Sequence, residues 1–432
     1  MNRGSGINVG LMGLGVVGGG VASALLRDPS PVSARVGCPV NLRRTLVRDI
    51  SRPRDVELPP GILTTNAEDI LDDPDIDILV EVMGGSDPAT DYFRRAISAG
   101  KHVVTANKEV MAKDGAELMS LARANRVSLL FEASVGGGIP IVGCLMNELA
   151  ANDVYSIRTI INGTTNYILT RMAHQRTAFA EALAEAQGLG YAEADPTNDV
   201  EGIDAAYKLT VLATLAYGCR FRPEDVYRQG ISALEPQDFR YAREFGYSIK
   251  SLAIADRDDG GVQLRVYPAL VPEENMLANV NGVYNAAEVD GDLCGRVLFH
   301  GMGAGRGPTT SAVLGDLIET ARMVRDDAVP GGPRELSRGL AVRPIDELHT
   351  RYYIRLEVAD RAGVLAQIAK ALGDCDISIA SVLQKDAHAE TQSAEIVIMT
   401  HPARESSVQQ ALLEISQLSP VRRVGNMIRI EE

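Results

Sequence analysis

Short apolar runs alternate with segments of helical period along the first 150 residues. Apolar residues recur at the spacing of one helix face over residues 17–26, which predicts a helix there. Repetition of strand, helix and strand predicts a mostly parallel sheet with helices on both faces. The apolar runs predict five strands of this sheet, at residues 7–11, 40–47, 76–82, 102–104 and 128–132.

The pattern changes near residue 151, where helical stretches become longer and strand signals fewer. We expect one helix over residues 178–187, ended by Gly188, and another over residues 200–217. A glycine-dense turn at residues 301–307 precedes a helical pattern at 311–324, which we expect to return to the first domain. These patterns predict a first domain at 1–150 with a return segment at 301–330, and a second domain at 151–300.

The last part of the chain begins with Pro330-Gly331-Gly332-Pro333, which predicts a linker because both residue types interrupt regular structure; we place this linker at 331–349. Beyond it, the pattern predicts a ferredoxin-like βαββαβ domain over residues 350–432. The expected fold is therefore α/β, with a Rossmann-type parallel-sheet domain, an α+β domain and this small third domain. The six elements of the third domain are expected at 352–359, 362–373, 377–385, 393–400, 406–417 and 421–430.

Charge and composition narrow the class of partner. A chain of 432 residues has room for roughly three domains with their own cores. Its 43 basic and 57 acidic residues give a net charge of −14, and it has no long basic run, which argues against nucleic acid or an anionic membrane as partner. The apolar run at 209–217 is about half the ~20 residues that a membrane span needs, and we expect neither a secretion signal nor a membrane anchor. Small molecules are the expected ligands.

The cysteines carry no metal-binding pattern. They lie far apart and without CxxC spacing, and the six histidines do not cluster with them. This usage favours a reducing cytoplasm and argues against a thiolate metal site. The five are Cys38, Cys144, Cys219, Cys294 and Cys375.

A glycine motif follows the first predicted strand. Gly13, Gly15 and Gly18 form GxGxxG between that strand and the first helix, where glycines permit a tight turn, close approach of a pyrophosphate and close helix packing. The backbone N–H groups at the helix start, at Val16 and Val17, would face the phosphates. The alternative is a glycine turn packed in an α/β core, which does not require this strand–turn–helix register.

The second strand ends near Arg48 and Asp49, which point to different cofactors. A carboxylate here favours the ribose hydroxyl of NAD, and an arginine favours the 2′-phosphate of NADP. Because Arg52 and Arg54 follow closely, we favour NADP, with Arg48 as its contact. NAD stays open, since these arginines can also be solvated residues of a loop.

Two lysines stand out because only seven of the 43 basic residues are lysines. Lys108 follows the predicted strand at 102–104, where the carboxyl ends of parallel strands meet ligands. Lys208 lies four residues after Asp204 on a predicted helix, so the two share a face that continues through apolar residues. They form either a surface ion pair or part of a reaction site. A lysine ammonium can stabilise and then protonate the oxygen of a carbonyl that is being reduced, and two neighbouring ammonium groups lower each other's pKa.

Three carboxylates, Glu193, Asp195 and Asp199, lie within seven residues in the segment 190–199. They suit a substrate ammonium, a metal, or simply a solvated turn with caps for the next helix. On the residues alone, the turn is the favoured interpretation.

Six stretches together resemble the monofunctional homoserine dehydrogenases that carry an ACT domain. The resemblance implies reversible NAD(P)H-dependent reduction of L-aspartate 4-semialdehyde to L-homoserine, on the route to threonine, methionine and isoleucine. It also implies that the second domain is catalytic and mediates dimerisation, and that the protein is a homodimer or higher homo-oligomer. The stretches are GLGVVG at 13–18, TANKE at 105–109, EASVGGGIPI at 132–141, INGTTNYIL at 161–169, GYAEADPTNDVEGIDAAYK at 190–208 and GMGAGRGPT at 301–309.

Residue roles follow from the same resemblance. It implies that Lys208 is the proton donor and that Lys108 touches both cofactor and substrate. An amino-acid substrate explains nearby acids, because its ammonium needs carboxylate partners when desolvated. The implied substrate-binding acids are Glu193, Asp199 and Asp204, of which Asp204 also belongs to the catalytic set, and the further cofactor contacts are Thr105, Gly190 and Gly303.

The resemblance also implies a monovalent cation, commonly sodium, held largely by backbone oxygens. Its pattern falls on Glu132, Val135, Gly137 and Ile139. The same glycine run is equally typical of a plain loop.

The segments 356–365 and 377–382 resemble an ACT module, a type that binds amino acids and pairs with its own kind. Threonine is the expected effector. Ala362 replaces the proline that is common before Gly363, which predicts a less rigid loop.

Other function classes fit less well. An aspartate-semialdehyde dehydrogenase that works through a thioester needs an activated cysteine beside a base, and no cysteine here has that context. A non-catalytic dinucleotide and amino-acid sensor, or another Rossmann oxidoreductase of amino-acid metabolism, remains as an alternative. A sensor has no need of Lys108, Asp204 and Lys208 together, so their joint presence favours the enzyme.

Overall fold

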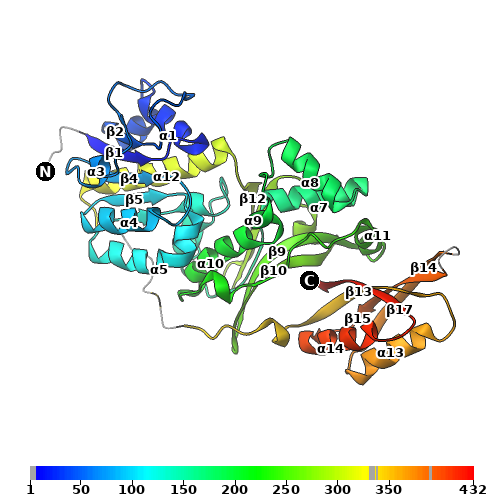
Figure 1. The fold of residues 1–432 in the computed structure, drawn as a ribbon. Coiled ribbons are helices and arrows are strands. Elements are labelled where there is room, and N and C mark those ends of the chain that lie inside the picture. The colour runs from blue at the N-terminus through cyan, green and yellow to red at the C-terminus, as the bar shows by residue number, and fades with distance from the viewer. Residues whose placement is uncertain (1–5, 330–335, 337–338, 389–391) are drawn as a thin grey trace. The chain divides into compact units, whose positions relative to one another are not determined.

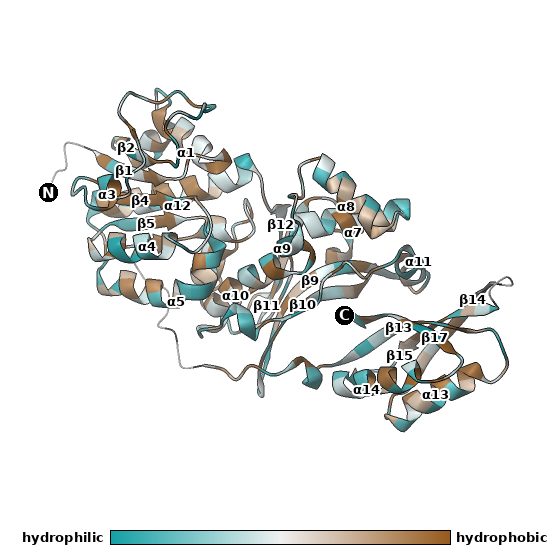
Figure 2. Ribbon diagram, in the orientation of Figure 1, coloured by the Kyte–Doolittle hydropathy of each residue, from teal (hydrophilic) through white to brown (hydrophobic). Residues whose placement is uncertain are grey.

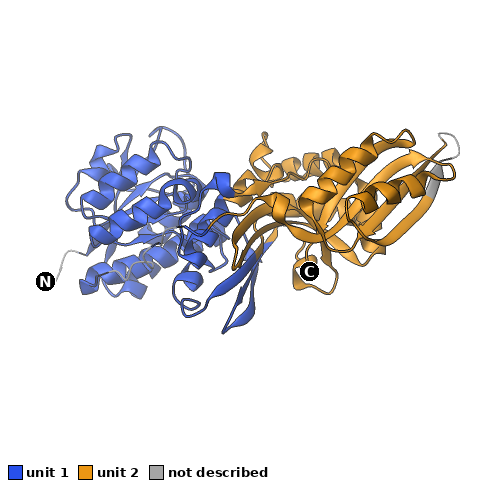
Figure 3. Ribbon diagram, turned by 90° about the horizontal axis from the view of Figure 1, so that it is seen from below, with its two compact units in different colours: residues 1–157, 207–225, 285–340 blue, residues 158–206, 226–284, 341–432 orange. Residues whose placement is uncertain are grey.

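The computed structural model describes residues 6–329, 336, 339–388 and 392–432. The Pro330–Pro333 segment of the predicted linker therefore lies outside the described residues. The chain forms two compact units, one of residues 1–157, 207–225 and 285–340 and the other of residues 158–206, 226–284 and 341–432 (Figure 3). The predicted three-domain boundaries stay a prediction, because the two units divide the chain by compactness and place 341–432 together with parts of the second predicted domain.

A parallel sheet of six strands forms the centre of the first unit, as the alternation of strands and helices predicts. Val9 and Leu11 in the first strand are completely buried, because helices cover both faces of the sheet. The predicted strand at 128–132 is shorter, since Glu132 begins a 3-10 turn instead. In spatial order the strands are β3 (Leu63–Thr64), β2 (Val40–Leu46), β1 (Ile7–Met12), β4 (Ile78–Glu81), β5 (His102–Thr105) and β6 (Leu129–Leu130).

Helix α12 (Arg306–Asp326) returns the chain to this sheet. It begins five residues before the predicted start and lies beside α1 (Val16–Leu26) in Figure 1. Its Val313 and Leu317 pack into the same core as the first strand. The other helices of the sheet are α2 (Pro31–Val36), α3 (Glu68–Leu71), α4 (Ala89–Ser98), α5 (Lys108–Ala124) and α6 (Val142–Met146); α4 and α5 alternate apolar and polar residues (Figure 2).

A hairpin completes the first unit. It consists of β11 (Tyr284–Gly291) and β12 (Gly295–Met302), and β12 lies at the end of its strand order. Strand β7 (Val154–Ile160) and helix α10 (Ile203–Tyr217) each contribute residues to both units.

The second unit contains long strands that the sequence pattern did not predict. Strand β10 (Gly261–Pro272) pairs antiparallel with β9 (Tyr247–Asp258), and almost every residue of β10 is buried, so it lacks the apolar–polar alternation of a half-exposed strand. The helix predicted over 200–217 is also wrong in detail. It is interrupted at Gly202, whose φ of +74° ends α9 (Thr197–Val200) before α10 begins.

Of the remaining α-helices of this unit before residue 341, the sequence pattern predicts one and misses two. Helix α8 (Phe179–Gly188) covers the predicted 178–187 segment and includes Gly188 as its last residue. Helices α7 (Gly163–Gln175) and α11 (Pro236–Glu244) and the short strand β8 (Tyr227–Arg228) complete it. None of the described helices has the length and apolar character that a bilayer span requires.

The C-terminal part has the predicted βαββαβ order, with a short additional strand, β16 (Ala403–Arg404). Its strands are ordered β17-β13-β15-β14, and α13 and α14 share a hydrophobic core with them on one face (Figure 1). The bounds are β13 (His349–Ala359), α13 (Val364–Asp374), β14 (Ile379–His388), β15 (Ser393–Thr400), α14 (Glu405–Ser416) and β17 (Val421–Ile430).

This C-terminal part is joined to the rest of the second unit along one sheet. Strand β17 pairs in parallel with β10, with Leu270 opposite Ile430. The face of the sheet opposite α13 and α14 packs on α11, where Tyr353 and Val397 share a core with Phe239. The module is therefore an integral part of the second unit.

A buried ion cluster holds this junction. The guanidinium of Arg355 on β13, whose side chain is 2% exposed, lies 2.7 Å from carboxylate oxygens of both Asp238 and Glu235 and 3.1 Å from Glu395. Arg423 and Arg355 lower the pKa of Glu235 to about 2. A lowered carboxyl pKa stabilises the fold above the ordinary value of 4.5, so this contribution is lost as the pH falls towards 2.

Replacement of Arg355 by Ala should cost about 3–5 kcal/mol of unfolding free energy, because it leaves the fully buried Asp238 without its cation. Arg423→Ala is the matched control: its side chain is 49% exposed and it pairs with Glu235 of the same cluster, so about 1 kcal/mol or less should be lost. Urea unfolding at neutral pH measures both. Equal losses in the two variants would contradict the assignment of Arg355 as the central cation.

Candidate active site

The glycine motif packs as a tight backbone turn between β1 and α1. Gly13 has a φ of +98°, and a Cβ on it would lie 2.9 Å from the carbonyl oxygen of Val82. A Cβ on Gly18 would lie 2.1 Å from the carbonyl oxygen of Gly13. Around Gly15, in contrast, no described atom lies within 4 Å of a Cβ position. Two glycines thus serve internal packing, and the second leaves room for a ligand to approach the backbone.

The start of α1 is suited to an anion. Gly15 is the N-cap and offers no side-chain cap, and no acidic residue lies in the first turn. Val16, the first helical residue, is 65% exposed. The first N–H groups of a helix have no intrahelical partner and point out along the helix axis, where the helix dipole favours a phosphate.

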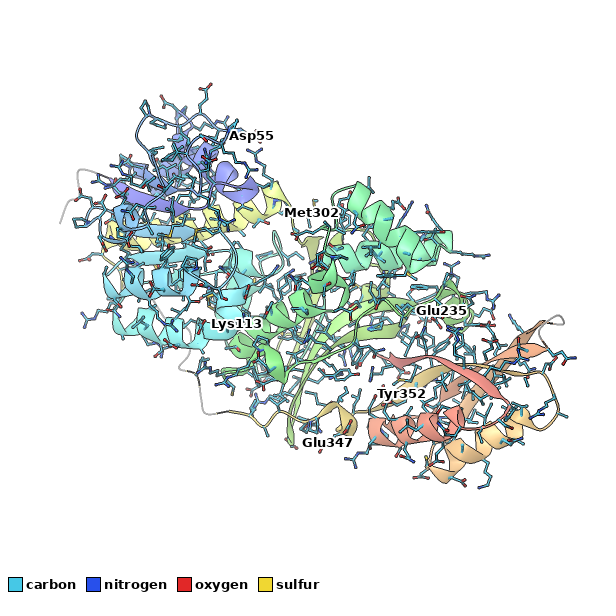
Figure 4. The ribbon with its side chains drawn as sticks, in the orientation of Figure 1. Asp55, Lys113, Glu235, Met302, Glu347 and Tyr352 are labelled. Atoms are coloured by element: carbon cyan, nitrogen blue, oxygen red, sulfur yellow. The ribbon has the colours of Figure 1, made fainter. Side chains whose placement is uncertain are left out.

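The arginines of the loop after β2 have different surroundings. Asp55 of this loop is labelled in Figure 4. Arg54 donates hydrogen bonds to the backbone carbonyls of Asp49, Ile50 and Arg52 and so holds the loop together. The Asp49 carboxylate accepts hydrogen bonds from the backbone and hydroxyl of Ser51, which lower its pKa. Arg48 lies exposed at the start of the same loop.

At the carboxyl ends of β4 and β5, a buried hydrogen-bond network precedes Lys108. The hydroxyl of Thr105 donates to Glu81 at 2.6 Å and accepts from the backbone N–H of Asn107 at 2.9 Å. The Asn107 side chain accepts from the N–H of Val110 and thereby caps α5. Lys108 is the first residue of that helix and is half-buried.

Lys208 lies half-buried on α10. The ammonium of Lys113 on α5 lies 5.6 Å from the ring centroid of Tyr207, the residue before Lys208 (Lys113 is labelled in Figure 4). This contact brings α5 and α10 together in the first unit. Lys108 is on α5, about 7.5 Å along the helix from Lys113. The two candidate lysines, Lys108 and Lys208, therefore lie on helices that contact each other.

Asn162 joins two of the predicted acids in the second unit. Its amide nitrogen donates to Asp199 at 2.7 Å and to Asp204 at 2.8 Å, while its oxygen accepts from the N–H of Thr165 and caps α7. Asp204 is only 4% exposed. The sequence pattern gives no sign of this link between the two acids, and the available signal is the position of Asn162 as an N-cap within the INGTTNYIL stretch.

The other two acids of the 190–199 segment, Glu193 and Asp195, do not share the Asn162 amide in the hydrogen bonds described. The Asp195 carboxylate accepts from the backbone and hydroxyl of Thr197 and so acts as the turn residue that the solvated-turn interpretation predicts. The side chain of Glu193 is exposed, and its backbone carbonyl accepts from Gln187. Gly190 is also exposed, with a φ of +76°.

Two glycine-rich segments contact each other backbone to backbone. A Cβ on Gly137 would lie 2.4 Å from the carbonyl oxygen of Gly303, and a Cβ on Gly303 would overlap the side chain of Asn285. The N–H of Gly138 donates to the carbonyl of Met302, labelled in Figure 4, at 3.1 Å. Side chains at these positions would separate the second glycine turn from the loop after Glu132.

The loop that begins at Glu132 lies beside two half-buried carboxyl groups, those of Glu132 and Asp316. The Glu132 carboxylate accepts hydrogen bonds from the first N–H groups of the α6 region, including Gly143 at 2.6 Å, and the backbone N–H of Glu132 donates to Asp316 at 2.9 Å. Burial raises the pKa of both carboxyl groups. Val135 and Ile139 of the same loop are buried. Two neighbouring carboxyl groups that are shielded from water favour a nearby cation.

No cluster of three or more His, Cys, Asp or Glu side chains suited to a metal occurs within the described ranges.

Comparison with known proteins places these features in one family. The family models described as homoserine dehydrogenase, its NAD-binding domain and the ACT domain match residues 140–318, 13–132 and 352–420. A homoserine dehydrogenase from Synechocystis is 44% identical over 433 residues, covering 98% of this chain and 99% of the relative. The crystal structure of a homoserine dehydrogenase from Thiobacillus denitrificans superposes with a TM-score of 0.92 at 44% identity over 99% of each chain.

A hyperthermophilic archaeal homoserine dehydrogenase, solved in complex with NADPH, is more distant. It has a TM-score of 0.60 and 28% identity, and the match covers 73% of this chain and 97% of that one.

Gly18→Ala should weaken dinucleotide binding by about tenfold or more, because its Cβ would displace the backbone of Gly13. Gly19→Ala is the control on the same helix, since no described atom lies within 4 Å of its Cβ position and alanine favours a helix by about 0.5–1 kcal/mol. Titration of NADPH fluorescence compares them. Equal affinity in both variants would refute the role assigned to the turn.

Proposed function

This chain belongs to the homoserine dehydrogenase family, and from that premise we propose how its own residues carry out the reaction. It is an NAD(P)-dependent oxidoreductase that interconverts L-aspartate 4-semialdehyde and L-homoserine. The strongest support is the end-to-end match to relatives of the same domain order. A non-catalytic sensor is not favoured.

Lys208 is the proposed proton donor. When bound, the reduced nicotinamide supplies a hydride to the aldehyde carbon. The ammonium of Lys208 hydrogen-bonds the carbonyl oxygen, stabilises the negative charge that develops on it and transfers a proton to it, which completes the alcohol. Lys108, on the neighbouring helix, contacts cofactor and substrate and favours proton release through like-charge repulsion.

The substrate ammonium is assigned to the acids of the second unit. Asp199 and Asp204 are held together by the Asn162 amide, which fixes their spacing, and Glu193 completes the proposed set. A charge-assisted hydrogen bond to a carboxylate suits an α-amino group. Gly190, Thr105 and Gly303 are proposed cofactor contacts; because the hydroxyl of Thr105 is occupied by Glu81 and Asn107, it acts through the shape of this edge.

Lys208→Ala should lower kcat by about 10²–10⁴-fold, as expected for loss of a general acid, while NADPH affinity remains close to that of the wild type. Lys370→Ala, an exposed lysine on α13, is the control and should leave kcat unchanged. Absorbance of the reduced nicotinamide measures turnover. Wild-type kcat in Lys208→Ala would remove Lys208 from the mechanism.

NADP is the proposed cofactor, with Arg48 at its 2′-phosphate. Arg48 is exposed at the end of β2, whereas Arg54 is occupied by loop carbonyls. The NADPH complex of the archaeal relative supports this preference. NAD is the alternative, with Asp49 at the ribose.

With homoserine as substrate, Arg48→Ala should raise KM for NADP⁺ by about tenfold or more and leave KM for NAD⁺ unchanged, because a charge-assisted contact to phosphate is lost. Arg54→Ala should disturb the loop and affect both cofactors alike. Absorbance of the reduced cofactor measures the activity of each of the two variants with each of the two cofactors. A wild-type enzyme that prefers NAD⁺ would contradict the assignment.

A monovalent cation, Na⁺ by proposal, lies in the loop of Glu132, Val135, Gly137 and Ile139. The neighbouring, half-buried carboxyl groups of Glu132 and Asp316, whose pKa values are raised, and the left-handed turn at Gly137 support it. Activity that is identical in sodium and choline salts would speak against it.

The C-terminal module is an ACT domain, which supports regulation by an amino acid, and threonine is our proposed effector. Ala362 and Gly363, with a φ of +89°, form the turn at the start of α13. No change in rate at saturating threonine would remove this effector.

We propose a homodimer or higher homo-oligomer located in the cytoplasm. Strand β12 lies at the end of its strand order, with Leu293 73% exposed and Met302 47% exposed nearby, and these apolar residues suit a second copy of the chain. The five cysteines are odd in number, far apart in the sequence and without CxxC spacing, which fits a reducing compartment. A gel-filtration mass of one chain would contradict the oligomer.

A further inference from the structure

A fully buried carboxyl group lies at the carboxyl end of β4, outside the mechanism proposed above. Glu81 is the last residue of that strand and is 0% exposed. Burial raises the pKa of its carboxyl group, while its hydrogen bonds oppose the shift. A buried carboxyl group is costly, so the contacts that retain it indicate what it does.

One carboxylate oxygen of Glu81 supports the turn against the glycine motif. Its Oε1 accepts hydrogen bonds from the backbone N–H of Met83 at 2.7 Å and of Gly84 at 3.2 Å. The Val82–Met83 segment lies directly against Gly13, where a Cβ would come within 2.9 Å of Val82 and 3.1 Å of Met83. Glu81 therefore fixes the wall on which the glycine turn rests.

The other carboxylate oxygen supports the start of α5. Its Oε2 accepts from the Thr105 hydroxyl, which in turn accepts from the N–H of Asn107. The Asn107 side chain caps α5 and also donates to the carbonyl of Gly85 at 2.7 Å, which ties it back to the segment after β4. Lys108 is the next residue in the chain.

We propose that Glu81 is a positioning residue, which holds the glycine turn at Gly13 and the helix start at Lys108 in fixed relation through its two oxygens. The two elements follow different strands, and Glu81 bonds to both at the edge where ligands of parallel sheets bind. The proposal rests on the role of Lys108 given above. An error of 1 Å between two such groups costs about 10²-fold in rate.

Three variants separate positioning from stability. Glu81→Gln keeps the volume and one acceptor oxygen but presents an NH₂ group that cannot accept from the other donor. Thr105→Val removes the hydroxyl at nearly constant shape. Thr45→Val is the matched control, because Thr45 is a fully buried threonine of β2 whose hydroxyl has no hydrogen-bond partner among the described residues. At 25 °C, Glu81→Gln and Thr105→Val should each lower kcat/KM by about 10–100-fold and weaken NADPH binding, whereas Thr45→Val stays within about threefold of the wild type.

Lys108→Ala shows whether the effect on turnover passes through Lys108. In that background, Glu81→Gln should produce no further fall in kcat, because the group that it positions is absent. A full additional loss of kcat would overturn the proposal. So would a Glu81→Gln protein with a lower Tm but unchanged NADPH affinity and kcat/KM, or equal losses in Thr45→Val and Thr105→Val.

The role of Lys108 itself is judged separately. Wild-type turnover by Lys108→Ala would refute that role, without reference to Glu81. NADPH affinity of Glu81→Gln, measured by fluorescence without turnover, then decides the remaining claim: weakened binding supports a role in positioning the glycine turn, and unchanged binding overturns the proposal.

Discussion

Buried polar groups need partners, and the carboxyl edge of the parallel sheet is where this protein meets that requirement most strictly. Strands β4 and β5 end in Glu81 and Thr105, both completely buried. Water does not reach them, so the segments after the strands must supply the donors and acceptors. Their backbone turns and the helix that begins with Lys108 are consequently held by a connected set of hydrogen bonds. A rigid edge of this kind suits a site that must align two reacting molecules.

The same requirement shapes the second unit with different residues. There the side-chain nitrogen of Asn162 donates hydrogen bonds to Asp199 and Asp204, and its side-chain oxygen caps helix α7. At the ACT junction, the guanidinium of Arg355 pairs with three carboxylates at once. Arg429 pairs with Glu405, and both side chains are 1% exposed. The two arginine clusters are costly to break, because removal of the arginine leaves Asp238 or Glu405 buried and charged.

The ACT module consequently shares its sheet and its ion clusters with the rest of the second unit. The β10–β17 pairing and the core around Tyr353 and Phe239 connect them through backbone and side chains together. A ligand that shifts β13 or β17 must also shift residues that contact α11 and β10. Such a shared sheet gives amino-acid binding a direct physical route into the second unit, since packed interfaces change between discrete arrangements.

The residue pattern alone determined the parallel sheet, the glycine turn and the βαββαβ order of the C-terminal part, because each depends on local periodicity or on a motif with fixed spacing. It missed β9 and β10, which are buried too evenly to alternate, and the break at Gly202, which needs a left-handed backbone. Asn162, Glu81 and Arg355 gain their importance only from partners that are distant in sequence, such as Asp204, Thr105 and Asp238. Tertiary structure decided those pairings, because a hydrogen bond between remote segments leaves no periodic signal in the chain.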